Sequence, residues 1–441
     1  MTTVITYGTF DLFHEGHYNI LKRAKEQGDY LIVGVTSENY DKSRGKLNVK
    51  QSLIDRIENV KKSGFADKII VEEYLGQKIE DIKKYNVDKF VIGSDWMGKF
   101  DYLNEYCEVV YLERTKGVSS TQLRNAERGI IKLGCVGAGR IAKRMCRESR
   151  YVSGINFDYI YARNIEKAQK FAEDNDLKFY TDNFGEFLDE VDAVYIATPH
   201  LTHYEFAKRA IMAGKHVLCE KPLVLEKEQA EELYKLAKEK NVVLFEAIKT
   251  AYAPGFIRLI SIAKSGVIGE IKDVNATFTK LMADRNCREF DPHQAGGSIT
   301  ELATYPLVAI IKLLGLDYES LDSFSYKDEN GIDLYSKIIV KYKNAIATAN
   351  VGLGVKSEGE LIISGTKGYI VVPAPWWKTE YFEVRYEDPN KIDRYFVKFD
   401  EDGLRYEVAD FLNSIVNNVD NIQLKNEESI KIVEIIEKTL K

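Results

Sequence analysis

Cysteine is scarce in this chain and shows no metal-binding spacing. The sequence has five cysteines, an odd number that does not complete a disulfide framework, and no Cys-x-x-Cys pair occurs. We therefore expect reduced thiols in a cytoplasmic protein, with no metal site built from protein ligands.

Long apolar runs and a surplus of basic residues are also missing. No stretch of about 18 uninterrupted apolar residues occurs, so no membrane-spanning helix is expected. Residues 1–8 lack the basic and then apolar pattern of a signal peptide. The formal net charge is −6, so overall charge does not attract nucleic acid or an anionic membrane. We expect small-molecule partners, with any anion site built locally.

The chain does contain two similar α/β beginnings. Its 441 residues exceed the size of one ordinary domain. Residues 4–7 and 131–136 are short apolar runs that each lead into a glycine, followed by helical patterns at about 17–27 and from about 140. Alternating strands and helices of this kind predict parallel sheets. The expected strands are residues 4–7, 30–36, 68–72, 89–92 and 108–112, and then 131–136, 156–162, 193–197, 216–219 and 242–246.

The pattern changes after about residue 248. Longer alternating runs predict an α+β domain with a mainly antiparallel sheet, and residues 406–441 read as helical. The expected strands are residues 273–280, 336–342, 345–352, 360–364 and 381–386. We predict domains at residues 1–128, 129–247 and 248–441. A homodimer is expected, because the exposed face of an antiparallel sheet needs covering.

A histidine pair marks the first unit. His14 and His17 flank Gly16 where the first strand turns into a helix. Backbone N–H groups at a helix N-terminus bind anions, and imidazoles there stabilise charge that develops on a phosphate. Taken alone, this spacing is more often incidental than functional.

A second polar string follows the last strand of the same unit. Arg114-Thr115-Lys116-Gly117-Val118-Ser119-Ser120-Thr121 supplies a guanidinium, hydroxyls and a glycine that suit phosphate oxygens. Lys46 and Arg56 are further candidate cations for a phosphate. Both strings in one small α/β unit favour a nucleotide-phosphate site.

These strings resemble the HxGH nucleotidyltransferases, and among them the glycerol-3-phosphate cytidylyltransferases. Residues 6–12 match the opening of that family, residues 93–101 its GxDWxGKFD stretch, and residues 107–121 its closing signature. The resemblance implies a Rossmann-like fold and attack by a substrate phosphate on the α-phosphorus of CTP, with Mg²⁺ present and pyrophosphate leaving.

The same resemblance implies roles for individual residues. It assigns catalysis to His14, His17, Lys46 and Arg114, and acceptor binding to Lys46 and Arg56. It assigns nucleotide binding to Thr9, Phe10, His14, His17, Asp95, Arg114, Thr115, Ser119 and Ser120. Two features depart from the family: Ser120 replaces a threonine, and residues 41–55 differ from the glycerol-phosphate enzymes. CTP is therefore better supported than glycerol 3-phosphate.

The second unit opens with a dinucleotide-binding pattern. Gly137-Ala138-Gly139-Arg140-Ile141-Ala142 follows a strand and begins a helix, the context in which GxGxxA binds a pyrophosphate. Ala162 and Arg163 end the second strand, where an acidic residue would select NAD(H). Arg163 favours NADP(H) instead, with NAD(H) still possible. In the alternative, Arg163 only stacks on adenine.

Further polar residues lie at expected strand ends. Thr198 and Pro199, with His203 soon after, follow one strand, and Glu220 and Lys221 follow the next. Ligands bind at such strand ends in open α/β sheets. Tyr305 lies on a helix opened by two glycines, and its pattern alone favours a core tyrosine.

Residues 130–441 resemble the Gfo/Idh/MocA oxidoreductases. The glycine loop, the ATPxxxH-like stretch and Glu220-Lys221-Pro222 match, and Tyr305 with the RxFDP-like string matches the dihydrodiol dehydrogenase branch. The resemblance implies hydride transfer, with Lys221 polarising the substrate oxygen and Tyr305 as acid or base. It implies cofactor binding by Gly137, Gly139, Arg140, Ile141, Ala162, Arg163, Thr198, Pro199, His203, Glu220 and Lys221. Glu301 departs from the usual aspartate.

The pairing of the two units predicts a bifunctional enzyme that makes a CDP-polyol. One half would reduce a keto- or aldehyde-phosphate with NADPH, and the other would transfer CMP to the resulting polyol phosphate, for capsule or teichoic-acid-like polymers. Three alternatives stay open. The oxidoreductase acts on the CDP-linked product, or it is a silent cofactor-binding or dimerisation module, or the transferase uses ATP.

Overall fold

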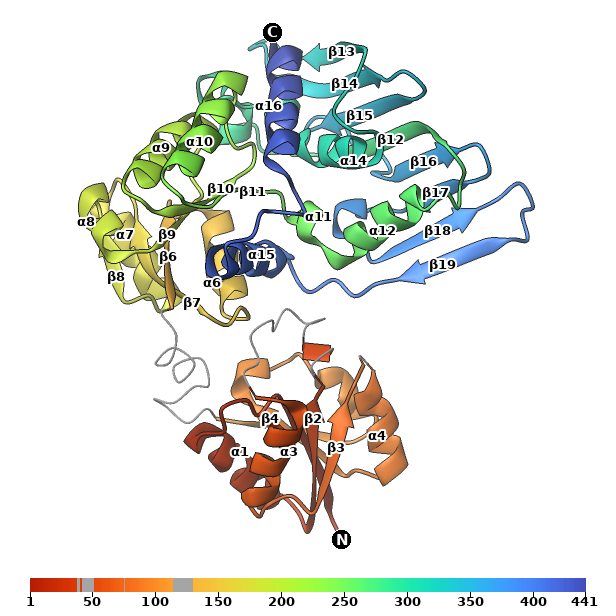
Figure 1. Cartoon of the computed structure of the whole chain (residues 1–441). Helices are drawn as coiled ribbons and strands as arrows, with labels where there is room; N and C mark the ends of the chain where they lie inside the picture. The colour runs from red at the N-terminus through yellow and green to blue at the C-terminus, as the bar shows by residue number, and fades with distance from the viewer. Residues whose placement is uncertain (38–39, 42–50, 75, 114–129) are drawn as a thin grey trace. The chain divides into compact units, whose positions relative to one another are not determined.

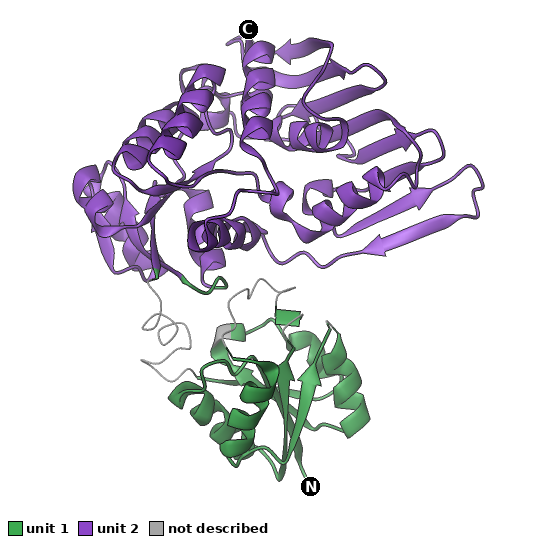
Figure 2. Ribbon diagram, viewed as in Figure 1, with its two compact units in different colours: residues 1–130, 151–154 green, residues 131–150, 155–441 purple. Residues whose placement is uncertain are grey.

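The chain folds into two compact units in this computed structural model, which describes residues 1–37, 40–41, 51–74, 76–113 and 130–441. One unit contains residues 1–130 and 151–154, and the other contains residues 131–150 and 155–441 (Figure 2). The domain boundary expected at residue 128 lies outside the described residues.

The first unit is built on a five-stranded parallel sheet. Its strand order is β3-β2-β1-β4-β5, so β1 lies at the centre of the sheet, between β2 and β4. The strands are β1 Thr3–Gly8, β2 Tyr30–Thr36, β3 Lys68–Glu72, β4 Lys89–Gly93 and β5 Glu108–Leu112. The helices are α1 Glu15–Lys25, α3 Leu53–Lys62, α4 Gln77–Tyr85, η1 Ser94–Trp96 and η2 Asp101–Glu105. All five predicted strands are present.

Apolar residues cover both faces of this sheet. One cluster gathers Val4, Leu21, Val33 and Val91 under α1 and α3, and another gathers Ile5, Ile32 and Phe90 on the opposite face. Alternate residues of β1 therefore point to different cores, as a strand buried on both faces requires.

The second unit contains a six-stranded parallel sheet. Its order, β11-β10-β9-β6-β7-β8, is that of a dinucleotide-binding Rossmann sheet. The strands are β6 Ile131–Val136, β7 Ile155–Tyr161, β8 Phe179–Thr181, β9 Ala193–Ile196, β10 His216–Glu220 and β11 Leu244–Ala247. The helices are α6 Arg140–Ser149, α7 Ile165–Asn175, α8 Phe184–Glu190, η3 His200–Thr202, α9 His203–Met212, α10 Lys227–Glu239, α11 Lys249–Tyr252 and α12 Pro254–Lys264.

An eight-stranded sheet follows in the same unit. Its order is β13-β14-β15-β12-β16-β17-β18-β19, and every pair is antiparallel except β12 with β15. This confirms the expected α/β fold with a mainly antiparallel C-terminal sheet. The strands are β12 Ile271–Thr279, β13 Ser320–Lys327, β14 Asp333–Lys341, β15 Ile346–Gly352, β16 Leu361–Gly365, β17 Tyr369–Val372, β18 Tyr381–Arg385 and β19 Ile392–Phe396. The helices are η4 Arg288–Phe290, η5 Pro292–Gln294, α13 Ser298–Leu302, α14 Thr304–Leu314 and η6 Trp376–Lys378.

Two last helices return to the Rossmann sheet. They are α15 Leu404–Asn417 and α16 Asn426–Leu440. α15 packs against α6 and α11, and α16 packs against α10 and α14 (Figure 1). Val433 of α16 belongs to the same apolar cluster as Val136 and Val194. The apolar core beside the Rossmann sheet therefore includes a residue of α16 that is distant in sequence from the strands.

No single helix in the described part of the chain is long and apolar enough to cross a membrane. One bent pair, Pro292–Leu302 with Thr304–Leu314, passes that test by length and composition alone.

Candidate functional sites

The loop after β1 brings the first histidine to a helix start. His14 is the N-cap of α1, and its Nδ1 accepts a hydrogen bond from the backbone N–H of Gly16 at 3.0 Å. The His14 and His17 rings stack with their centroids 3.9 Å apart. Phe10 and Phe13 flank His17, at ring-centroid distances of 5.4 and 5.6 Å. The aromatic neighbours therefore fix both imidazoles at the positive end of α1.

The backbone of this loop takes left-handed conformations at two bulky residues. Phe10 has a φ of 51° and Leu12 a φ of 47°. Non-glycine residues adopt this region at a cost of about 1–3 kcal/mol, so the surrounding contacts must hold them there. Gln51 provides one such contact, because its side-chain oxygen accepts from the Leu12 N–H at 2.8 Å. The loop is thus held in a defined shape.

Arg56 lies in the interior beneath this loop. Its Nη1 donates to the backbone carbonyls of Thr9 and Thr36 at 2.9 and 2.8 Å, and it pairs with Asp41 at 3.3 Å. The Arg56 side chain is 0% exposed. We expected this residue to bind an acceptor phosphate, but its side chain is buried and bonds to the protein backbone and to Asp41 instead. Its Nη1 therefore joins the end of β2 to the residue just after β1 through hydrogen bonds.

The remaining predicted residues of this unit are only partly visible. Lys46, Arg114, Thr115, Ser119 and Ser120 lie outside the described residues. Asp95 lies in η1, directly after β4, and its side chain is outside the description as well. Thr9 is described and buried, and its hydroxyl donates to Asp41 at 3.1 Å.

The glycine loop of the second unit fits a dinucleotide. Gly137 has a φ of 106°, and a Cβ there would lie 2.6 Å from the carbonyl oxygen of Ala197. Gly139 is the N-cap of α6 and has no side chain that could satisfy the helix N–H groups. A pyrophosphate can take that position. Ile141 is half-buried in the first turn of α6, and the Arg140 guanidinium pairs with Glu289 at 2.7 Å.

The end of β7 carries the residues expected to select the cofactor. Ala162 is buried, and Arg163 is exposed just before the N-cap of α7. No ion pair or hydrogen bond to Arg163 occurs within the described residues. The guanidinium is therefore available to a ligand at the carboxyl edge of the sheet.

Lys221 and Tyr305 come from distant segments and lie close together. The Lys221 Nζ is 5.7 Å from the centroid of the Tyr305 ring, and it donates to the backbone carbonyl of Glu301 at 2.7 Å. Burial raises the pKa of the Tyr305 phenol, and the charges of Glu220 and Glu407 raise it further. The Tyr305 phenol is therefore protonated at neutral pH.

Glu220 is held beside this pair by a buried tyrosine. Its Oε1 accepts from the Tyr195 hydroxyl at 2.6 Å. Burial raises the pKa of Glu220, and the charge of Lys221 opposes that rise. Thr198 and Pro199 are half-buried at the end of β9, where the Thr198 hydroxyl accepts from Thr202 at 2.8 Å.

His203 is placed differently from the expectation that it contacts the cofactor. Its side chain is 0% exposed, and its two ring nitrogens lie 2.9 Å from the carbonyl oxygens of Pro222 and Thr198. Burial lowers the pKa of His203, and the two carbonyl acceptors oppose that shift. It connects the loops after β9 and β10 rather than facing a ligand.

Three aromatic rings that the sequence analysis did not connect lie in a row. Phe278 of β12 stacks on Trp377 with centroids 3.7 Å apart, and it lies 5.1 Å from the Tyr305 ring. The neighbouring Trp376 is buried and donates its Nε1–H to the Thr277 carbonyl at 2.8 Å. The two adjacent tryptophans stand out in the sequence, but their contact with β12 follows only from the fold.

A buried carboxylate whose charge acts on Tyr305 was also missed. Glu407 of α15 is 0% exposed, and neither carboxylate oxygen has a hydrogen-bond partner within the described residues. Burial raises the pKa of Glu407, and the charge of Glu220 adds to this, while Lys249 opposes it. Nothing in the sequence pattern marks a glutamate on a helix as buried.

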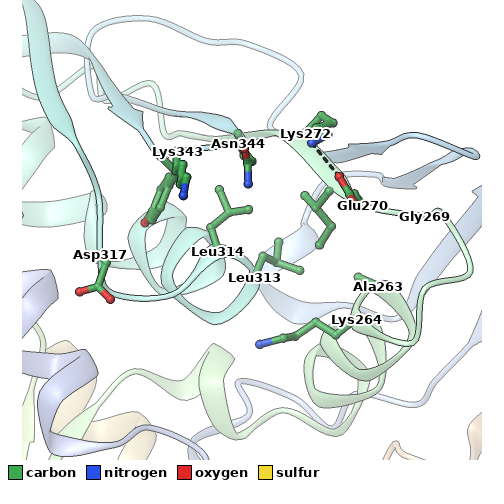
Figure 3. Close-up of a pocket in the computed structure, with 13 residues that line it drawn as sticks. Ala263, Lys264, Gly269, Glu270, Lys272, Leu313, Leu314, Asp317, Lys343 and Asn344 are labelled. Carbon is green, nitrogen blue, oxygen red and sulfur yellow. Dashed lines mark ion pairs between the residues drawn. The ribbon is translucent and has the colours of Figure 1, made fainter.

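A separate hollow of about 460 Å³ lies in the C-terminal part of this unit. It is formed by the ends of α12 and α14 and by the β14–β15 turn, and Glu270 pairs there with Lys272 at 2.8 Å (Figure 3). None of the expected site residues lines it.

Comparisons with known proteins match both units. Residues 5–126 match the cytidylyltransferase-like family, residues 131–248 match the oxidoreductase family with an NAD-binding Rossmann fold, and residues 256–371 match the GFO/IDH/MocA C-terminal domain. The chain belongs to both families: it joins a cytidylyltransferase to an NAD(P)-dependent oxidoreductase of the Gfo/Idh/MocA family.

Individual relatives agree with this assignment. The glycerol-3-phosphate cytidylyltransferase of Bacillus spizizenii is 48% identical over 129 residues, which are 28% of this chain and 95% of that protein. The scyllo-inositol 2-dehydrogenase (NADP(+)) of Bacillus subtilis is 26% identical over 309 residues, 68% of this chain and 92% of that protein. A 3-ketoreductase of Actinomadura kijaniata, solved with NADP and TDP-benzene, shares the fold with a TM-score of 0.65 at 22% identity, covering 70% of this chain and 97% of that one.

Proposed function

We propose that this bifunctional enzyme makes a CDP-activated polyol. The oxidoreductase half reduces a keto- or aldehyde-phosphate with NADPH to a polyol phosphate. The cytidylyltransferase half then transfers CMP from CTP to that phosphate. The observation that carries the proposal is the union of these two families in one chain, because a reductase can make the alcohol phosphate that such a transferase consumes.

The transfer step is a phosphoryl substitution. A phosphate oxygen of the acceptor forms a bond to the α-phosphorus of CTP, the α–β phosphoanhydride bond breaks, and pyrophosphate leaves. Mg²⁺ bound with CTP would offset the negative charge of the phosphates. His14 and His17, at the positive end of α1, stabilise the charge that develops on the α-phosphate. The product CDP-polyol would serve the synthesis of capsule or teichoic-acid-like polymers.

The reduction step uses Lys221 and Tyr305. NADPH, when bound, would supply the hydride that reduces the carbonyl carbon. Lys221 polarises the carbonyl oxygen, and the Tyr305 hydroxyl gives that oxygen its proton. Gly137 and Gly139 with the start of α6 would hold the pyrophosphate of the cofactor, and Arg163 would pair with the 2′-phosphate of NADP(H).

A substrate panel tests the coupled scheme. The protein is incubated with CTP, NADPH and C3–C5 keto- and aldehyde-phosphates, and mass spectrometry follows CDP-polyol. We expect a CDP-polyol that forms only when both CTP and NADPH are present. CDP-product formed from ready-made polyol phosphates, with no NADPH-dependent reduction of any carbonyl substrate, contradicts the scheme.

A second candidate places the oxidoreductase after the transferase. One relative, the dTDP-3,4-didehydro-2,6-dideoxy-alpha-D-glucose 3-reductase of Actinomadura kijaniata, is 31% identical over 195 residues, 43% of this chain and 58% of that protein. Its name describes a nucleotide-linked substrate, and the stacked rings of Phe278 and Trp377 offer apolar surface beside Tyr305. Purified CDP-glycerol with NADP⁺ distinguishes the two orders, because only the second candidate predicts the appearance of NADPH absorbance.

We also propose a homodimer in solution. Phe324 and Tyr326 of the edge strand β13 are 66% and 65% exposed, which is unusual for aromatic residues of a monomer. Sedimentation velocity at micromolar concentration tests this: a single boundary at the mass of one chain contradicts it.

A further inference from the structure

The site contains an arginine whose part in the reaction neither the sequence pattern nor the relatives define. Arg288 lies in η4, and its Nη2 pairs with Oε1 of Glu301 at 2.7 Å. The backbone carbonyl of the same Glu301 accepts the hydrogen bond from Lys221 at 2.7 Å. One residue therefore contacts the lysine through its main chain and the arginine through its side chain.

We propose that Arg288 is a positioning residue of the oxidoreductase, which holds the Glu301 carboxylate apart from Lys221 and thereby leaves the lysine ammonium free to bind the substrate oxygen. The proposal rests on the proposed role of Lys221. Within the described residues, no ion pair joins the Glu301 carboxylate to Lys221, although the two residues touch through the backbone.

The length of the side chain at position 301 explains why the Arg288–Glu301 ion pair matters. The family resemblance places an aspartate there, and Glu301 has one more methylene group. A longer carboxylate has more freedom to reach a neighbouring ammonium group, and an ion pair would neutralise the charge that polarises the substrate. A fixed guanidinium partner removes that freedom.

The other polar neighbour of Glu301 does not replace Arg288. The Nε2 of His200 lies 3.7 Å from Glu301 Oε1. Burial lowers the pKa of His200 well below its usual value, so the ring carries no charge at neutral pH. Arg288 is therefore the charged partner of Glu301 in the described structure.

The segment that carries Arg288 is itself well anchored. The Gly297 N–H donates to the Glu289 carbonyl at 2.9 Å, and a Cβ on Gly296 would lie 2.7 Å from that same oxygen. The Glu289 carboxylate pairs with Arg140 at the start of α6. Close packing on one side and an ion pair on the other fix the backbone beside Arg288.

The test compares R288M, E301Q and the double variant R288M/E301Q. Its first readout is independent of any reaction: the rate of Lys221 acylation by acetic anhydride, measured by peptide mass spectrometry against the other lysines. In R288M the freed carboxylate should pair with Lys221 and slow its acylation about tenfold, because the ion pair favours the protonated ammonium and only the neutral amine reacts. In the double variant, acylation should return to within about threefold of the parent protein.

The second readout is kcat with the carbonyl substrate found in the panel. We expect R288M to lose about 10- to 100-fold in kcat, with KM and NADPH affinity little changed, and the double variant to recover most of the loss. R285M is the matched control: Arg285 lies in the same loop over the Phe290 ring, at 4.4 Å, and does not pair with Glu301. It should behave like the parent.

Two results overturn the proposal. One is an unchanged rate of Lys221 acylation in R288M. The other is a loss of kcat in R288M that persists fully in R288M/E301Q, which would place Arg288 on the substrate itself. Thermal unfolding and NADPH binding establish that each variant is folded. If no carbonyl compound is reduced at all, the proposed function fails while the acylation readout still decides the role of Arg288.

Discussion

The Nη1 atom of Arg56 lies 3.3 Å from Oδ2 of Asp41, and both side chains are wholly buried. The same nitrogen donates to carbonyls at the ends of β1 and β2. Removing one member of such a pair leaves an uncompensated charge in the interior, which typically costs about 3–5 kcal/mol.

We therefore expect R56M to destabilise the first unit by about 3 kcal/mol or more. The measurement is urea unfolding followed by a probe in that unit. K62M is the control, because Lys62 is 75% exposed and pairs only distantly with Glu58. Equal stability of R56M and K62M would mean that the buried pair is not needed.

The stacked histidines predict a selective loss of one activity. H14A and H17A should each lower CTP-dependent pyrophosphate release about 100- to 1000-fold, the usual effect of losing a donor to developing charge. NADPH-dependent reduction by the same preparations should persist, since the residues proposed for the reduction belong to the second unit. A parallel loss of both activities would point to misfolding instead.

The exposed Arg163 predicts the preference for NADP(H). R163D should weaken NADPH binding about 10- to 100-fold and weaken NADH binding far less, because a carboxylate repels the 2′-phosphate. Fluorescence titration measures both affinities. K170D, an exposed charge reversal on the following helix, should change neither. An unchanged ratio of the two affinities in R163D contradicts the assignment.

Glu246 predicts a dependence of stability on pH. Burial raises its pKa to about 7 from an ordinary 4.5, while the Ser429 hydroxyl and the Leu223 N–H donate to its carboxylate. Between these values the folded protein binds more protons than the unfolded chain. The contribution of Glu246 is thus fully present below about pH 4.5 and is lost as the pH rises through 7.

Urea unfolding of the parent, E246Q and the exposed control E239Q at pH 5 and pH 8 measures this contribution. E246Q should lose less stability between the two pH values than the parent does, because glutamine does not titrate. E239Q should follow the parent. An equal change in E246Q and the parent would show that Glu246 does not cause the dependence.

The sequence predicted the parallel sheets best, because their strands are short runs of mainly apolar residues. The predicted strands 30–36, 68–72, 108–112 and 131–136 match β2, β3, β5 and β6, because apolar residues bounded by turns identify buried parallel strands. β13 was missed for the opposite reason. It is an edge strand whose residues are nearly all exposed, and its alternation of aromatic and polar residues covers only residues 323–327, too short a stretch to stand out.

The candidate sites were predictable where a motif fixes local geometry. Gly137 and His14 lie where their motifs placed them, at a strand end and a helix start. The partners that set the chemistry come from distant segments, as Arg288 does for Glu301 and Phe278 for Tyr305. Such pairings depend on how the sheet and helices pack, which a single sequence does not encode in any short pattern.

Helix α16 has a consequence for how the chain folds during synthesis. Val433 of this helix packs into the cluster that contains Val136 and Val194, so the Rossmann core has a gap until the ribosome has made that helix. The five strands of the first unit need no residue that follows them by hundreds of positions. The transferase can therefore fold on the ribosome before the cofactor-binding core is complete, because that core needs helix α16 to cover its apolar residues.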